Sequence, residues 1–174
     1  GEVSHRWPSA LPDGRRVLFT IKKEGIKSFD EGEIAILDLD SGSWKTIIQG
    51  GSFARYLPTG QIVFARGDTI FAVPFDLSRE KALGDPIPAV SGVMTQPGSG
   101  AAQFAVAQEA GTLVLDPLVH DECGVATVVE IMFGPSSGHP HRACSVHHQY
   151  SSSVSPFHAN TGTPRGLSMV PLGP

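Results

Sequence analysis

A short turn-and-strand motif occurs twice in this chain and constrains the fold more than any other feature. Residues 11–19 read "LPDGRRVLF" and residues 57–64 read "LPTGQIVF", so the two copies start 46 residues apart. In each copy a proline and a glycine favour a tight turn, because proline presets one φ and glycine accepts a positive one. The β-branched and aromatic residues that follow each turn favour a strand.

The two copies continue to match beyond the turn. In the first copy, strands are predicted over residues 15–21, 33–39 and 44–50. In the second copy they are predicted over residues 52–57, 61–66, 69–77 and 85–93. A third copy covers residues 101–115, with strands at "QFAVA" and "TLVL", and its Gly111 follows Gly60 by 51 positions.

A repeat of about 45–50 residues with four short strands is typical of a β-propeller blade. We therefore predict an all-β chain that holds about two and a half four-stranded antiparallel blades and an irregular C-terminal tail. The blades would cover residues of about 1–51, 52–93 and 94–116 onward. An antiparallel sandwich with chance similarity at two turns is the alternative fold. The aromatic side chains of Trp44 and Phe53 are expected to pack between blades, and His5 and Trp7 at a repeat edge.

The repeats resemble those of a known family. The stretches "HRWPSALPDGRRVLFT", "GEIAILDLDSGSWKTIIQGG" and "ARYLPTGQIVFARGDTIFAVPFDL" resemble the WD40-like propeller repeats of the TolB-like group. They are most similar to the C-terminal propeller of bacterial membrane-bound serine/threonine protein kinases, in which the string "RYLPxGxLVYxxxGxLFAVPFDL" is characteristic. Residues 55–77 follow that string closely, and the resemblance covers residues 5 to about 115.

This resemblance implies a non-catalytic module for protein interaction or ligand sensing, cut from a longer receptor-like kinase. The parent protein would be anchored in a membrane, with this region on the extracytoplasmic side. The chain contains no HRD or DFG string, so kinase activity would belong to the parent only. Two other functions stay open: the accessory propeller of a prolyl-oligopeptidase-type peptidase, and a TolB-like envelope scaffold. Exposed blade faces would also favour self-association.

Composition changes abruptly near residue 116. The first 116 residues contain 25 of the 30 charged Asp, Glu, Lys and Arg side chains, whereas six of the seven histidines and both cysteines follow them. Residues 124–133 could still form a strand, but beyond Gly134 the Ser, Pro, His and Gly residues show no period. We therefore interpret residues 117–174 as an irregular tail, and a shifted reading frame and natural disorder both remain open.

The tail also contains the only candidate metal ligands. Zinc prefers four thiolate or imidazole ligands in paired positions two to four residues apart. The candidates are His120, Cys123, His139, His141 and Cys144. Their spacing matches no standard zinc module, so the preferred expectation is that the chain binds no metal and no cofactor.

Other classes of function find no support in the sequence. The formal net charge of −4 argues against a nucleic-acid partner, which needs clustered Lys and Arg. There is no apolar run long enough to cross a membrane. No nucleophile elbow, P-loop or dinucleotide-binding glycine motif occurs, so no catalytic residue is predicted. The acidic stretches at residues 29–33 and 38–42 lack the spacing of a calcium-binding loop.

Overall fold

The structure, a computed structural model, describes residues 1–107, 112–115, 127–132 and 143–147. Within these residues the chain is all-β, with one short 3-10 turn, η1 (Phe29–Glu31), and no α-helix. The expected fold class is therefore confirmed at the level of antiparallel β-sheets. The sheets do not close into a ring or barrel within the described part.

Three sheets follow one another along the chain. Sheet 1 has the order β1 (Glu2–Ala10), β2 (Arg16–Lys23), β3 (Glu33–Asp38), β4 (Trp44–Gln49). Sheet 2 consists of β5 (Ser52–Leu57), β6 (Gln61–Arg66), β7 (Thr69–Asp76), β8 (Lys81–Ala82) and β9 (Ile87–Ser91), and both β8 and β9 pair with β7. The hairpin β10 (Thr95–Gln96) and β11 (Ala101–Ala102) leads to sheet 3, with the order β12 (Phe104–Ala107), β13 (Thr112–Leu115), β14 (Thr127–Met132), β15 (Ala143–His147).

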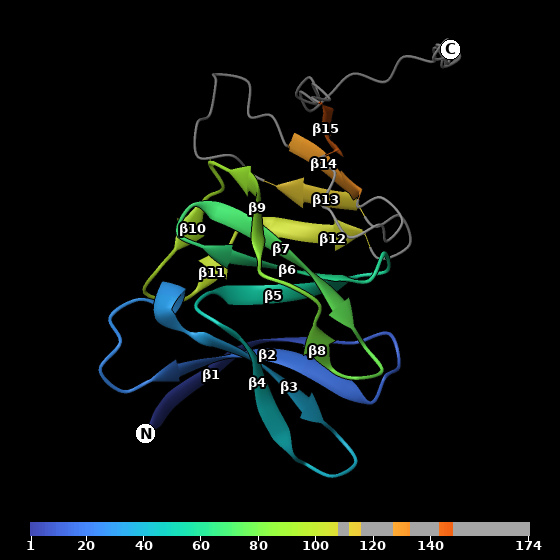
Figure 1. Ribbon diagram of the computed structural model, residues 1–174. Coiled ribbons are helices and arrows are strands. Elements are labelled where there is room, and N and C mark those ends of the chain that lie inside the picture. The colour runs from blue at the N-terminus through green and yellow to red at the C-terminus, as the bar shows by residue number, and fades with distance from the viewer. Residues whose placement is uncertain (108–111, 116–126, 133–142, 148–174) are drawn as a thin grey trace, which may run out of the picture.

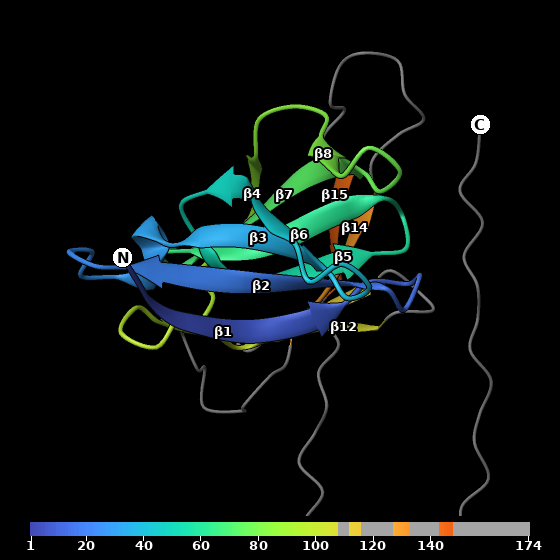
Figure 2. The same ribbon diagram turned by 90° about the horizontal axis from the view of Figure 1, so that it is seen from below.

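The sheets lie in layers, with sheet 2 between sheets 1 and 3 (Figure 1). In each sheet the first strand is an edge strand, namely β1, β5 and β12. Seen from below, β1 and β4 lie at opposite margins of sheet 1, and β8 lies on the same side as β4 (Figure 2). The first strands therefore gather on one side of the molecule and the last strands on the other.

Two apolar cores hold the layers together. Alternate residues of sheet 1, among them Leu18 and Ile36, belong to one buried cluster with Ile62 and Phe64 of sheet 2. The intervening residues of sheet 2 belong to a second cluster, which Phe104 and its neighbours in sheet 3 complete. Strand β6 is buried on both faces for this reason, as expected for the middle layer of three.

The outer face of sheet 1 bears a smaller apolar cluster. Phe19, Ile21 and Ala35 form this cluster. Trp44 contacts Phe19 edge-on, with ring centroids 6.1 Å apart, and keeps 42% of its surface exposed. Trp44 therefore does not pack between two of the described sheets, because β4 pairs it with Leu37 on the outward-facing side, and its packing between blades stays a prediction.

Polar contacts fix how sheet 1 sits on sheet 2. A carboxylate oxygen of Asp30, in η1, accepts from the backbone N–H of Gly67 at 2.8 Å. The guanidinium of Arg66 donates to the carbonyls of Gln49 and Gly50 at 2.9 and 2.6 Å. These bonds connect the end of β6 and the β6–β7 turn to sheet 1. In each bond a side chain of one layer pairs with a backbone group of the other.

The strands expected in the repeats are present with bounds within about two residues of the prediction, whereas β1 was not expected and the tail differs. The expected strands over residues 52–57 and 61–66 are present with those bounds. Residues 143–147 were expected to be irregular but form β15, which pairs with β14. Backbone pairing overrides the weak local pattern there. Within the expected strand over residues 124–133, β14 is present at Thr127–Met132, and the other tail residues lie outside the described ranges.

Candidate functional site

Three aromatic rings form a row across the first strands of the three sheets. The ring centroids of Trp7 (β1) and Phe53 (β5) lie 5.0 Å apart, and those of Phe53 and Phe104 (β12) lie 5.2 Å apart. We call these three residues the aromatic row. Each stands seven positions before the glycine at which the sequence predicts the turn of its repeat, respectively Gly14, Gly60 and Gly111. The row is therefore a property of the repeat, and it joins all three layers.

Two members of the row have unusual backbone conformations. Trp7 and Phe53 both have φ of +58°, in the left-handed region that bulky residues rarely adopt. The strand pairing of β1 and of β5 shifts register at these positions, as it does at a β-bulge. A bulge re-aims a side chain, and a left-handed residue costs about 1–2 kcal/mol. Such conformations gather at binding and catalytic sites, where the surrounding structure holds them in place.

Hydrogen bonds hold the row from both sides. The indole Nε1 of Trp7 donates to the carbonyl of Ser99 at 2.9 Å. The backbone N–H of Phe53 donates to the hydroxyl of Thr20 at 3.2 Å, and the Ser52 hydroxyl donates to the carbonyl of Gly100 at 3.0 Å. The turn between β10 and β11 is thus anchored against the first strands. The expectation of a repeat-edge packing role fits Trp7, and the expectation of inter-sheet packing fits Phe53.

Arg55 lies beside the row on β5. Its guanidinium carbon is 4.0 Å from the centroid of the Phe53 ring, which is a cation–π arrangement. Nη1 donates to the carbonyl of Ala54 at 2.8 Å. The side chain is partly buried, and this burial lowers the pKa of Arg55. Among the described residues no carboxylate forms an ion pair with it.

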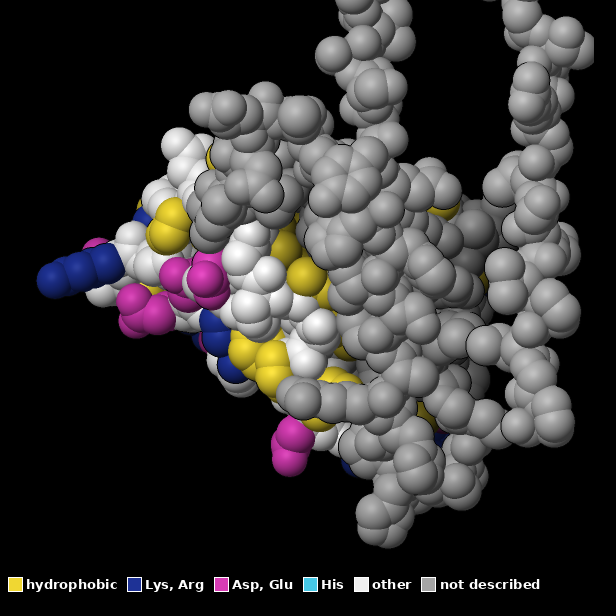
Figure 3. Space-filling model, turned by 90° about the horizontal axis from the view of Figure 1, so that it is seen from above, with side chains coloured by type: hydrophobic (Ala, Val, Ile, Leu, Met, Phe, Trp, Pro, Cys, Tyr) yellow, Lys and Arg dark blue, Asp and Glu magenta, His cyan; other side chains and the backbone are white. Residues whose placement is uncertain are grey.

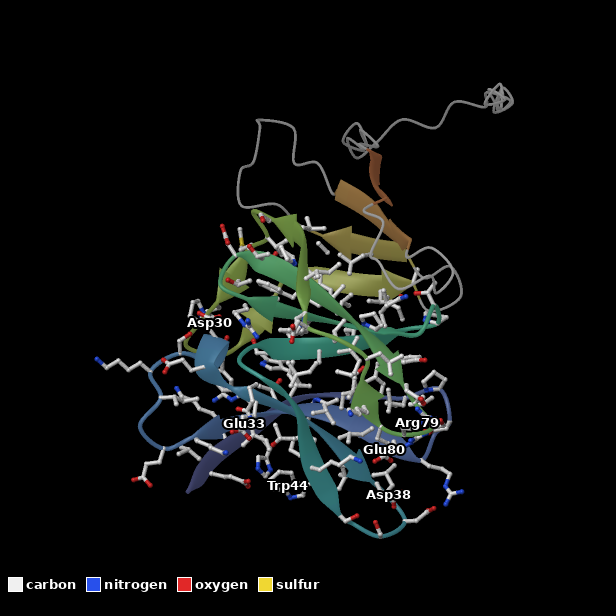
Figure 4. The ribbon with its side chains drawn as sticks, viewed as in Figure 1. Asp30, Glu33, Asp38, Trp44, Arg79 and Glu80 are labelled. Atoms are coloured by element: carbon white, nitrogen blue, oxygen red, sulfur yellow. The ribbon has the colours of Figure 1, made fainter. Side chains whose placement is uncertain are left out.

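A groove of about 260 Å³ lies on the opposite side, where the ends of β3 and β4 meet Glu80. Lys45 and Arg16 contact the Glu80 carboxylate at 2.8 and 3.1 Å. Asp38 accepts from the backbone N–H of Ser41 at 2.7 Å, and this bond holds the pKa of Asp38 below its usual range. Figure 4 shows Asp38 and Glu80 in this region. Glu80 is paired with two cations of sheet 1 and Asp38 with its own turn, so the groove links the layers and its carboxylates are occupied.

Two further carboxylates of sheet 1 are also occupied. Glu33, 8% exposed, accepts from Lys23 and from the hydroxyl of Thr46, and the bond from Lys23 is the main reason that its pKa is lowered. Asp30 is used in the contact with Gly67. Asp30 and Glu33, both from the acidic stretch at residues 29–33, thus make structural contacts, and Figure 4 shows where they lie. No cluster of three His, Cys, Asp or Glu that could hold a metal occurs in the described ranges.

The candidate zinc ligands are not brought together by anything the structure describes. His120, Cys123, His139 and His141 lie outside the described residues. Cys144 lies in β15, where its backbone pairs with Ile131 of β14. The zinc hypothesis therefore stays a prediction.

The aromatic row and Arg55 were not identified from the sequence, although one signal for them was present. The seven-residue spacing from aromatic residue to turn glycine occurs in all three repeats. Nothing in the spacing indicates the left-handed φ values, and nothing distinguishes Arg55 from the other arginines before its neighbours are known. Three-dimensional contacts were needed for both.

The fold defines an all-β protein of stacked antiparallel sheets. On the side where the first strands gather, it bears the aromatic row and the guanidinium of Arg55. No protein-family model, no curated protein and no solved structure matches the chain. Among the described residues, no helix has the length and apolar character needed to cross a bilayer.

Proposed function

We propose that this chain is part of a β-propeller and that it is a non-catalytic binding module. Three observations support the propeller: the repeat of about 46–51 residues, the antiparallel sheets of four or five strands in chain order, and the gathering of first strands on one side. First strands of propeller blades line the central channel. The aromatic row then lies on the channel side of the module.

The observation that most supports binding is the strained aromatic position that recurs in β1 and β5. Packing alone does not need a left-handed Trp or Phe, because a residue with normal φ can fill the same space at lower cost. The half-buried rings of Trp7 and Phe53 present a flat apolar surface beside one guanidinium. Surfaces that combine aromatic rings with a few polar groups are typical of ligand sites.

The resemblance of residues 5–115 to kinase-associated propellers extends the proposal. In this form the module senses a ligand or a protein on the extracytoplasmic side for a receptor-like serine/threonine kinase. No chemistry is proposed for the chain itself. Sequencing of the gene upstream tests the extension: a kinase domain followed by one membrane-spanning helix supports it, whereas a secretory signal alone contradicts it.

Binding can be tested with the protein's own fluorescence. The chain has two tryptophans, so Trp44→Phe leaves Trp7 in the row as the single reporter. We expect members of a library of small aromatic probes to shift the Trp7 emission saturably. Phe53→Leu should abolish these shifts, and Leu39→Ala, at a side chain 53% exposed on sheet 1, should leave them unchanged. Shifts that occur equally in all variants, or no shifts, would contradict a binding role for the row.

A further inference from the structure

Among the described arginines, Arg55 alone has neither a carboxylate nor a carbonyl from outside its own strand as a partner there. Arg15, Arg16 and Arg79 pair with acidic side chains, and Arg66 donates to carbonyls of sheet 1. Arg6 donates to the Ser4 hydroxyl and to the carbonyl of Ser99, in the turn between β10 and β11. The Arg55 guanidinium instead makes one hydrogen bond, to the carbonyl of the preceding residue. Most of its five donors therefore have no partner among the described residues.

The matching positions of the other two repeats supply no counter-ion for Arg55. Arg55 stands two residues after Phe53, and the same places after Trp7 and Phe104 hold Ser9 and Val106. Neither side chain can carry a negative charge. A guanidinium that is partly removed from water with no counter-ion among the described residues favours a role in binding.

The geometry prepares the group for one class of ligand. The guanidinium stacks on the Phe53 ring at 4.0 Å, which limits its rotation. A planar, fixed guanidinium offers paired N–H donors that match the two oxygens of a carboxylate. The Trp7 ring lies beyond Phe53 in the row, with its centroid 5.0 Å from that of Phe53, and adds to the apolar surface.

We propose that Arg55 and the aromatic row bind a ligand that carries a carboxylate next to a flat or apolar group. This inference rests on the proposed binding function and names the ligand chemistry of the same edge. The carboxylate pairs with the donors of Arg55 that have no partner among the described residues, and the apolar group lies against the row at Phe53 and Trp7. Such a carboxylate can come from a small organic acid or from an acidic side chain of a partner protein.

The test uses the Trp44→Phe chain with Trp7 as reporter and two matched pairs of probes. Benzoate is compared with benzamide, and N-acetyl-Phe-Asp-amide with N-acetyl-Phe-Asn-amide. We expect at least one acid to bind about tenfold or more tightly than its neutral counterpart, because charge-assisted hydrogen bonds are roughly twice as strong as neutral ones. The acid's affinity should fall as salt rises. Preference for the peptide would indicate a protein partner, and preference for benzoate a small acid.

Variants of two arginines decide whether the charge that matters is Arg55. Arg55→Gln should remove the preference for the acid. Arg55→Lys should keep only part of it, because an ammonium cannot stack on the Phe53 ring or form paired hydrogen bonds to both carboxylate oxygens. Arg79→Gln is the matched control, since that side chain is 78% exposed and lies on the β7–β8 loop. Thermal melts of each variant show whether it is folded. The lysine variant keeps the test valid if the glutamine variant unfolds.

The outcomes separate this inference from the proposed function. If the neutral and acidic probes bind equally, and binding is lost with Phe53→Leu but not with Arg55→Gln, the carboxylate inference is overturned and the binding module stands. The carboxylate inference is also overturned, and the binding module stands, if aromatic probes of the library bind but none of the matched acid and amide probes does. If no probe of any kind shifts Trp7, both proposals fail.

Discussion

The rings of Trp7 and Phe53 lie 5.0 Å apart, and both residues have φ of +58° at the same distance from the turn glycine of their repeats. The same left-handed backbone conformation thus occurs at the same repeat position in β1 and in β5, and the two side chains contact each other. The contact lies between the first strands of two successive sheets. It links the sequence repeat directly to the way in which the layers meet.

Phe53 is at the centre of the row, so its removal should weaken both layer contacts. Phe53→Ala deletes the ring contacts with Trp7 and Phe104 and the surface on which Arg55 stacks. We expect the free energy of unfolding to fall by about 2–4 kcal/mol, from lost burial and lost aromatic pairs. Urea unfolding measures this loss. Leu39→Ala, at an exposed position, should change it by less than about 0.5 kcal/mol.

Gly51 connects sheet 1 to sheet 2 and has no room for a side chain. A Cβ at this position would lie 2.5 Å from the Phe64 ring and 2.9 Å from the carbonyl of Ala65, at φ of +123°. Gly51→Ala should therefore destabilise the fold by about 2–4 kcal/mol through overpacking and backbone strain. Gly14→Ala is the control, because φ there is +66° but nothing lies within 4 Å of the added Cβ.

The comparison of these two glycines in denaturant separates the steric effect from the conformational one. Gly14→Ala should lose only about 1–2 kcal/mol, the cost of the left-handed backbone. Equal losses at both positions would show that the approach of Gly51 to Phe64 is not close in solution.

Most of the strand pattern could be predicted from the sequence, because local signals specify it. Pro–Gly turns and β-branched runs give β5 and β6 their bounds. Strand β1 has no such signal, because "EVSHRWPSA" is polar and contains a proline, as suits a mostly exposed edge strand. Its pairing with β2 is a tertiary effect that no local pattern encodes.

Register was harder to predict than strand existence. Counting from the turn glycines would match Arg15 with Gln61. The backbone instead joins Leu11 to Arg16 and pairs Leu57 with Gln61, so the first hairpin has one extra residue. Since side chains alternate between faces, a shift of one residue exchanges the inner and outer faces of β2. Only the pairing itself shows that Leu18 points to sheet 2 and Phe19 away from it.

The stability of the fold should depend on pH through the ion pairs of Glu80. Lys45 and then Arg16 hold the pKa of this carboxyl below its ordinary value of 4.5. A lowered folded-state pKa adds stability that is present above the unfolded pKa and is lost as the pH falls through the folded value. We expect the wild type to lose more stability between pH 6 and about pH 3 than Glu80→Gln does.

Parallel urea titrations at several pH values measure this difference. The described part of the face seen from above bears side chains of both signs (Figure 3). Glu24→Gln is a suitable control, because the Glu24 side chain is 81% exposed. If Glu24→Gln and Glu80→Gln flatten the acid limb equally, the network around Glu80 does not stabilise the fold.

Arg66 should not tolerate replacement by lysine, because its planar guanidinium donates to two carbonyls and also contacts two aromatic rings. Its guanidinium donates to Gln49 and Gly50 and lies 5.5 and 5.0 Å from the rings of Phe64 and Phe71. Lysine keeps the charge but cannot bridge two carbonyls while lying flat on the rings. Arg66→Lys should therefore reduce the free energy of unfolding by about 1–2 kcal/mol. Arg79→Lys, at an exposed side chain, should leave it nearly unchanged, and an equal effect of the two variants would show that geometry at Arg66 adds nothing beyond charge.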